Sequence, residues 1–146
     1  MEKSEAIVWL RRLGCSCVIL GGNRLSIYRR RGVRDLLALL DDNPGRLNGA
    51  FVADKVVGKG AAAIMIAGGV CGVYAGVISR PALRLLRDAS VQVEYDSLTD
   101  NIINRAATGI CPVESLCLPC SSAAECLPLV REFVRRHSQV NVTIQQ

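Results

Sequence analysis

The pattern of apolar and polar residues over the first thirty positions predicts a helix followed by a β-hairpin. The helix is expected over residues 4–13, where apolar positions recur at helical spacing, and Gly14 is placed to end it. Residues 15–20 (CSCVIL) and 24–28 (RLSIY) have strand character and flank residues 21–23 (GGN). Because glycine adopts the positive φ of tight turns, this spacing predicts a hairpin with a three-residue turn.

The middle of the chain predicts two helices and a buried strand. Apolar residues at i, i+3, i+4 and i+7 give residues 33–40 one apolar helical face, and residues 41–45 (DDNPG) have the turn chemistry to end that helix. A second, Ala-rich helix is expected from about residue 54 to 67. After a glycine pair, residues 72–79 (GVYAGVIS) form a continuous apolar run, which is typical of a strand buried on both faces.

Two further elements are expected in the next thirty residues. Pro81 suits the first turn of a helix, with Ser79 as its N-cap. Residues 91–95 (VQVEY) alternate and predict a strand. Ser97, followed three residues later by an acid, resembles a capping box and predicts a short helix that ends by Gly109.

The C-terminal part predicts a helix and a last strand. Ser122 and Glu125 form another capping box at the start of the helix, and Pro128 is expected either to kink it or to delay its start. Residues 140–144 (VNVTI) alternate and predict the strand. Hairpin, helices and strands in this order indicate an α/β sandwich with a mixed sheet.

Composition fits that fold and indicates a single domain over residues 1–146. A compact domain of this size buries roughly two-thirds of the surface of its unfolded chain. Half of the residues are apolar but only 4% are aromatic, so the core must consist mainly of Val, Leu, Ile and Ala. Such small side chains suit helices packed closely on a sheet.

The surroundings of the basic residues argue against a nucleic-acid partner. The chain carries a net charge of +5, and its densest basic run is Arg29, Arg30 and Arg31, followed by Arg34. No aromatic side chains interleave with these arginines, as they would in a surface on which bases stack. We interpret the run as the solvated edge of a hairpin strand.

The sequence predicts a cytoplasmic protein with no membrane span. The N-terminus is charged and has no apolar segment of a secretory signal. Residues 60–79 contain no charge and are long enough to cross a bilayer, but five glycines interrupt them and alanine predominates over leucine. The seven cysteines are expected to stay reduced, because cytosolic thiols rarely form disulfides.

The first candidate site is the stretch GAFVADKVVGKGAAA at residues 49–63. In the expected helix, Lys55 and Lys59 would repel one another on one face near the positive end of the helix dipole, and Gly58 and Gly60 would each lower helix propensity by about 1 kcal/mol. A bound anion would explain these unfavourable choices, with Asp54 as N-cap or as a partner of one lysine. The alternative is a solvated lysine pair. The pattern is not a Walker A loop, because the earlier glycine and the Ser or Thr are missing.

A second candidate site lies in residues 104–114 (NRAATGICPVE). Donors, a thiol and a carboxylate gather in this predicted loop, and a neighbouring cation would favour a nucleophilic thiolate. The residues concerned are Asn104, Arg105, Thr108, Cys111 and Glu114. The alternative is a polar connection in which Asn and Thr side chains cap the backbone.

The remaining chemistry rests on cysteines. Residues 111–126 contain four of them in the pattern C-x5-C-x2-C-x5-C, which permits a metal or redox site but lacks the two C-x2-C pairs of a usual zinc site. Cysteine is also a common small core residue. We therefore assign neither a metal nor a cofactor. His137, the only histidine, is expected to pack against the core rather than to act in catalysis.

Three segments resemble an uncharacterised family of small prokaryotic proteins grouped with the cytidine-deaminase-like superfamily. They are GAFVADKVVGKGAAA, GVYAGVIS followed by RPAL, and IINRAATGICPVE, and the similarity covers residues 13–135. The resemblance implies a three-layer αβα sandwich. Zinc deaminases place His-x-Glu at one helix start and Pro-Cys-x-x-Cys at the next. Here the corresponding positions hold Asp54-Lys55 and Ser79-Arg80-Pro81, so hydrolysis by zinc-bound hydroxide is not supported.

Together, the residues and the resemblance predict a zinc-independent protein that binds, and in one version transforms, a small anionic, nucleotide-like ligand. Lys55, Cys111 and Glu114 would be the reactive residues. The predicted ligand-binding residues are Asp54, Lys59, Ser79, Asn104, Arg105 and Thr108. The alternatives are a cysteine-based redox or metal-binding protein and a non-catalytic scaffold for a protein partner. The sequence leaves open whether the protein is an enzyme, and its composition is compatible with a homodimer.

Overall fold

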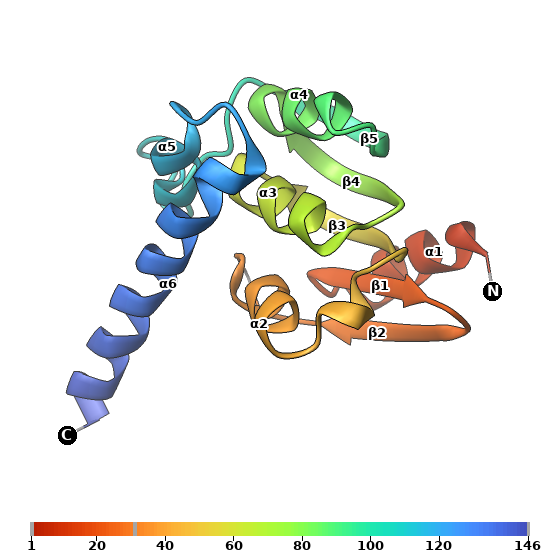
Figure 1. Cartoon of the computed structure of the whole chain (residues 1–146), viewed down its shortest axis with the longest axis horizontal. Helices are drawn as coiled ribbons and strands as arrows, with labels where there is room; N and C mark the ends of the chain where they lie inside the picture. Colours follow the sequence, from red (N-terminus) through yellow and green to blue (C-terminus); the bar gives the residue numbers. More distant parts are fainter. Residues whose placement is uncertain (1, 31, 146) are drawn as a thin grey trace.

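The described part of the chain contains five strands, six α-helices and one short 3₁₀ turn, η1. The computed structural model describes residues 2–30 and 32–145, with side-chain surroundings up to residue 137. In order, the elements shown in Figure 1 are α1 (Lys3–Leu13), β1 (Cys17–Gly21), β2 (Arg24–Tyr28), α2 (Arg34–Asp42), η1 (Pro44–Arg46), β3 (Phe51–Val57), α3 (Lys59–Gly68), β4 (Gly72–Ser79), α4 (Arg80–Asp88), β5 (Gln92–Thr99), α5 (Pro112–Cys117) and α6 (Ala123–Gln145).

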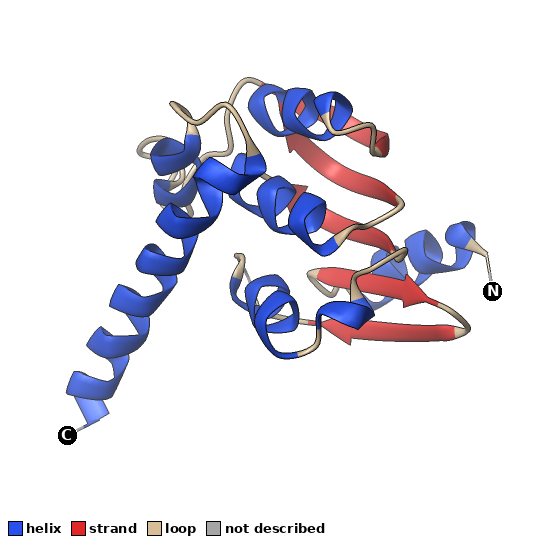
Figure 2. Ribbon diagram, viewed as in Figure 1, coloured by secondary structure: helices blue, strands red, loops and turns tan. Residues whose placement is uncertain are grey.

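The strands form one mixed sheet in the order β2-β1-β3-β4-β5 (Figure 2). β1 pairs antiparallel with both β2 and β3, whereas β3, β4 and β5 run parallel to one another. Parallel neighbours require crossover connections, and α3 and α4 provide them. The predicted α/β fold with a mixed sheet is therefore confirmed.

Helices cover both faces of the sheet. On one face, α1 packs Ala6 and Leu10 against Val18 and Phe51 in a small apolar cluster. On the other, α2, α3 and α4 cover a larger core that includes Val52 and many small side chains. These three layers agree with the predicted αβα arrangement.

α3 is the most deeply buried helix. Eight of its ten residues are buried, including the whole run from Lys59 to Met65. Its small side chains let α4 and α6 approach closely, and those two helices are its main helical neighbours. Figure 1 shows α6 passing over the start of α3 and then extending away from the sheet.

Three expected elements are wrong. Residues 54–57 belong to β3 and α3 begins only at Lys59, because the run 51–57 fits between β1 and β4 and Gly58 ends it. Residues 97–99 extend β5 beside the end of β4, and the expected helix after Ser97 does not form. Residues 140–144 continue α6, with Pro128 inside the helix, instead of forming a last strand.

Other local predictions are confirmed or refined. Gly14 ends α1 with φ 60°, and the Ser79 hydroxyl accepts a hydrogen bond from the amide of Ala82 at the start of α4. The hairpin has two turn residues rather than three, because Gly21 pairs with Arg24. Within the described residues, no helix is both long and apolar enough to cross a membrane.

Candidate functional site

The ends of β3 and β4 place two helix N-termini side by side. Gly58 precedes α3, and Ser79 is the N-cap of α4. Since β3 and β4 are parallel neighbours, both helix starts lie at the same edge of the sheet. Free backbone N–H groups and the helix dipoles make such an edge favourable for negative charge.

The carboxylate of Glu114 occupies this position. Its Oε1 accepts hydrogen bonds from the backbone N–H of Lys59 at 2.8 Å and from the Ser79 hydroxyl at 2.7 Å. Its Oε2 accepts a short hydrogen bond from the backbone N–H of Ile102. We call this set of three donors the carboxylate cradle. Glu114 is only 1% exposed, so a side chain of the protein itself fills the helix start near which the sequence predicted a bound anion.

Glu114 reaches the cradle because α5 lies against the start of α3. The contact is close at Gly60, where an added Cβ would collide with Val113. An added Cβ at Gly58 would lie 3.3 Å from Oε1 of Glu114 itself. The two glycines that seemed to weaken a helix therefore make room for α5 and its carboxylate.

Lys59 also holds the segment that follows α5. Its ammonium donates to the carbonyl oxygens of Leu118, at 3.1 Å, and of Cys120. The residue is only 7% exposed, and none of the ion pairs found within the described residues includes it. The backbone amide and the ammonium group of Lys59 thus hold the two ends of the segment 114–120.

Lys55 does not share a helical face with Lys59, which corrects the expected lysine pair. It lies on β3 with an exposed side chain, and its ammonium donates to the carbonyl oxygen of Gly14 at 2.9 Å. The expected repulsion between the two lysines, and the dipole penalty at Lys55, therefore do not arise. Only Lys59, of the two lysines, contacts the residues around the cradle.

Asp54 is buried on β3, where it pairs across the sheet with Cys17. Its Oδ1 accepts a hydrogen bond from the amide of Val56 at 3.3 Å. Burial raises the pKa of Asp54 from 3.8 to about 7, against the smaller lowering effect of the backbone amides of Val56 and Lys55. Burial likewise raises the pKa of Cys17, with the Asp54 charge as a second cause. Asp54 is thus a strand residue and not an N-cap of α3.

The loop before α5 keeps its polar residues at the surface. Asn104 and Thr108 bond to each other through two contacts of 3.0 Å, which supports the alternative of a self-capped polar connection. Arg105 is exposed, and Cys111 is half-buried directly before α5. The structure therefore brings together Lys59, Ser79 and Glu114 from the predicted set. The amide of Ile102 was missed, because a backbone donor leaves no signal in the sequence.

Three of the four C-terminal cysteines meet, and the fourth does not join them. Cys117, Cys120 and Cys126 pack in one cluster where α5 joins α6. Among the described residues, no group of three or more His, Cys, Asp or Glu side chains has an arrangement that could hold a metal ion. His137 is exposed and stacks on Phe133 with ring centroids 4.0 Å apart, so the expectation that it packs into the core is wrong.

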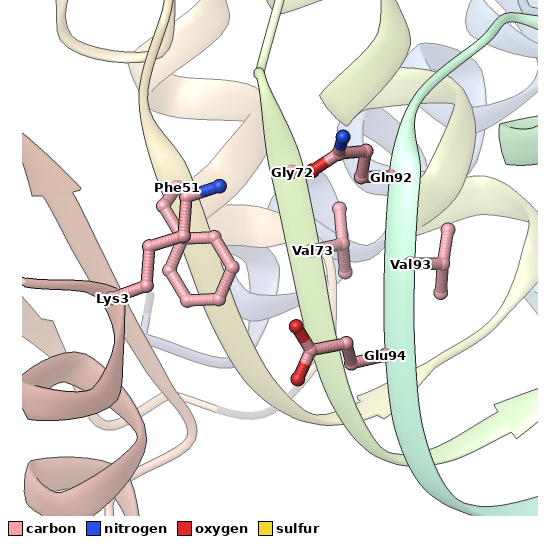
Figure 3. A pocket seen from close by; sticks show the side chains of 7 residues that line it. All are labelled: Lys3, Phe51, Gly72, Val73, Gln92, Val93 and Glu94. Atoms are coloured by element: carbon pink, nitrogen blue, oxygen red, sulfur yellow. The ribbon is translucent and has the colours of Figure 1, made fainter.

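An open pocket of about 310 Å³ lies at the amino ends of the parallel strands, opposite the cradle (Figure 3). Phe51, Gly72 and Gln92, the first residues of β3, β4 and β5, line it together with Lys3 and Glu94. None of the predicted site residues belongs to it. Arg31, part of the expected basic edge, lies outside the described residues, while Arg30 pairs with Asp35.

Comparison with known proteins gives a family and a fold. A family model described as "TM1506: Domain of unknown function (DUF1893)" matches residues 5–134. The crystal structure of the DUF1893 family protein TM1506 from Thermotoga maritima has a TM-score of 0.81 and 25% identity, and covers 90% of this chain and 91% of that chain.

A second solved structure, Acinetobacter baumannii RibD, has a TM-score of 0.43 and 17% identity, over 63% of this chain and 33% of that chain. No curated protein matches. The family model covers most of the chain, and the Thermotoga structure has the same fold over nearly its whole length. The chain therefore belongs to the DUF1893 family, whose function is unknown.

Proposed function

We propose that this protein is a zinc-independent, cytidine-deaminase-like domain that binds a small anionic ligand at the starts of α3 and α4. One observation carries the proposal: three donors from three parts of the chain converge on a single buried carboxylate. They lie beyond the carboxyl ends of adjacent parallel strands, which is where open α/β sheets commonly bind ligands. A phosphate or carboxylate group of a ligand would accept the same hydrogen bonds.

In this proposal Glu114 is the internal anion that keeps the cradle occupied until a ligand replaces it. α5 is short and belongs to a long connection between β5 and α6, so it can move without breaking the sheet. When Glu114 leaves, the ammonium of Lys59 can turn from its two carbonyl acceptors toward the incoming charge. Lys59 and Ser79 keep their predicted binding roles, and Glu114 becomes the competitor of the ligand.

The residues at the helix starts support a function without zinc at this position. α3 begins with Lys59 and Gly60, and α4 begins with Arg80 and Pro81. None of these side chains is a usual zinc ligand. The reactive role predicted for Cys111, the cytoplasmic location and the homodimer stay predictions.

Removal of the internal anion tests the proposal. In Glu114→Ala the cradle loses its carboxylate, so formate, acetate, inorganic phosphate and a nucleoside monophosphate should raise the melting temperature by mass action. The rise at a given anion concentration should exceed that of the parent severalfold. Glu94→Ala, which removes an exposed carboxylate at the other edge of the sheet, should behave like the parent.

Two further variants make the result specific. Glu114→Gln keeps the side-chain volume and serves if the alanine variant does not fold. Adding Ser79→Ala to Glu114→Ala removes one hydrogen-bond donor of the cradle. The rise in melting temperature that the anions cause should then be smaller. If the folded Glu114 variants respond to no anion, or respond only as much as Glu94→Ala, the cradle is purely structural and the proposed ligand site is wrong.

A further inference from the structure

Three reduced cysteines meet where α5 joins α6. Cys117 and Cys126 are 0% exposed, and Cys120, in the turn between the helices, is half-buried. The amide of Cys120 donates to the carbonyl oxygen of Cys117 at 3.0 Å, which folds the turn back over α5. Cys126, in the first turns of α6, packs in the same core cluster as Cys117 and Cys120, and both thiols contribute to raising its pKa.

The surroundings fix this arrangement. All three side chains pack into the main core, and the nearby Lys59 ammonium holds the carbonyl oxygen of Cys120. Burial raises the pKa values of Cys117 and Cys126, which keeps these two thiols protonated and unreactive toward reagents in solution. Cys120 is the member of the group with a path to solvent.

We propose that Cys120 is an oxidation site for hydroperoxides and that Cys126 resolves it to an intramolecular disulfide. Cys120 is oxidised first because it is the thiol of the group that solvent reaches. A buried thiol next to it then forms the disulfide. We assign Cys126 as that partner because a bond from the turn to α6 leaves the hydrogen bonds within α5 intact. This inference does not depend on anion binding at the cradle.

The two steps balance with a hydroperoxide as the oxidant. The Cys120 thiolate attacks the peroxide oxygen, the O–O bond breaks, and an alcohol or water leaves as Cys120 becomes a sulfenic acid. The Cys126 sulfur then attacks the sulfenic sulfur, a disulfide forms, and the hydroxyl leaves as water with the Cys126 proton. The pair of thiols loses two protons and two electrons, which reduce the hydroperoxide, and a dithiol reductant reverses the change.

Peptide mapping tests the assignment on the full chain. The reduced protein would carry Cys71→Ser, because Cys71 is an exposed thiol that could link two molecules. After one equivalent of hydrogen peroxide and alkylation, cleavage at glutamates gives peptides 115–125, with Cys117 and Cys120, and 126–132, with Cys126. We expect these two peptides to be joined in the monomer and separated by reduction.

Single substitutions distinguish the partners. In Cys117→Ala the link should persist. In Cys120→Ala it should be lost, and in Cys126→Ala dimedone should label Cys120 as a sulfenic acid. A link that survives Cys120→Ala, dimedone labelling at Cys111 or Cys117 instead, or fully alkylated thiols after peroxide in the Cys71→Ser protein would each overturn the proposal. Circular dichroism of each variant confirms folding.

Discussion

At the scale of single residues, two buried carboxyl groups differ in how many hydrogen-bond donors they meet. Glu114 accepts hydrogen bonds from two backbone amides and a hydroxyl, so both of its buried oxygens are paired. Asp54 meets only backbone amides, those of Val56, at 3.3 Å, and of Lys55, and their lowering effect on its pKa is smaller than the effect of burial. The burial of Asp54 therefore raises its pKa to about 7.

The raised pKa of Asp54 predicts that the free energy of unfolding falls as pH rises. This pKa is higher in the folded chain than in the unfolded chain, so the folded state binds more protons between about pH 4 and pH 7. The free energy of unfolding is therefore greatest below the unfolded pKa and decreases through this window. A shift of roughly three units sets an upper limit of about 4 kcal/mol on the change.

Urea unfolding at pH 5 and pH 8 measures this effect. Asp54→Asn keeps an acceptor for the amide of Val56 but removes the titration, so its urea midpoint should fall less between the two pH values than that of the parent. Asp88→Asn, an exposed control, should follow the parent. Equal pH dependence in the parent and in Asp54→Asn would show that Asp54 is not the group responsible.

At the scale of elements, the start of α3 is shaped by what packs on it. Gly58 has extended backbone angles as the N-cap, so it carries no helical penalty. Gly60 lies inside α3 and leaves the space that Val113 of α5 occupies. A glycine that is unfavourable for the isolated helix is therefore favoured by the helix that covers it.

We expect Gly60→Ala to lower the free energy of unfolding, although alanine has a better helix propensity than glycine. The gain in propensity is about 1 kcal/mol, whereas forcing an extra methyl group into a packed contact costs about 1–3 kcal/mol. Val113 is β-branched and adapts poorly, so α5 should be displaced. The free energy of unfolding from urea titration should fall.

Gly45→Ala is the matched control for that change. An added Cβ there meets nothing within 4 Å, and its φ is not positive. The substitution should leave stability unchanged or raise it by roughly 0.4–1 kcal/mol, because the unfolded chain loses freedom. Equal stabilisation by both substitutions would mean that α5 does not pack tightly on α3.

At the scale of the whole molecule, the sheet and the segment from residue 100 to 122 have different kinds of support. β1, β3 and β4 lie between paired neighbours and between layers of helices. The segment is attached mainly through the cradle, the Lys59 ammonium and the packing of α5. Such a difference allows local opening below the free energy of global unfolding.

Hydrogen exchange of Glu114→Gln tests that division. The amides of Cys111, Ser115 and Leu118 should lose at least tenfold of their protection, while those of β3 and β4 keep most of theirs. Glu132→Gln, which changes an exposed carboxylate on α6, should leave the segment protected. Uniform loss across the sheet and the segment would show that they unfold as one unit.

The sequence by itself determined most of the elements and the α/β fold with a mixed sheet, because hydrophobic period, glycine turns and the Ser79 cap act over a few residues. It also named Lys59, Ser79 and Glu114 among its candidate site residues, and the structure brings these three together. Local pattern failed at residues 54–57, 97–99 and 140–144. In the first two, pairing with a neighbouring strand outweighed helical signals; in the last, α6 simply continued.

Only the tertiary structure decided how the site is built. Glu114 lies 55 residues from the Lys59 amide that it binds and 35 from Ser79, and no local spacing encodes such contacts. The sequence predicted a bound anionic ligand near Lys55 and Lys59, whereas in the fold the carboxyl group of Glu114, from a distant short helix, accepts a hydrogen bond from the Lys59 amide. Long-range packing also separated Lys55 from Lys59 and gathered Cys117, Cys120 and Cys126, because only the folded chain sets which side chains share one space.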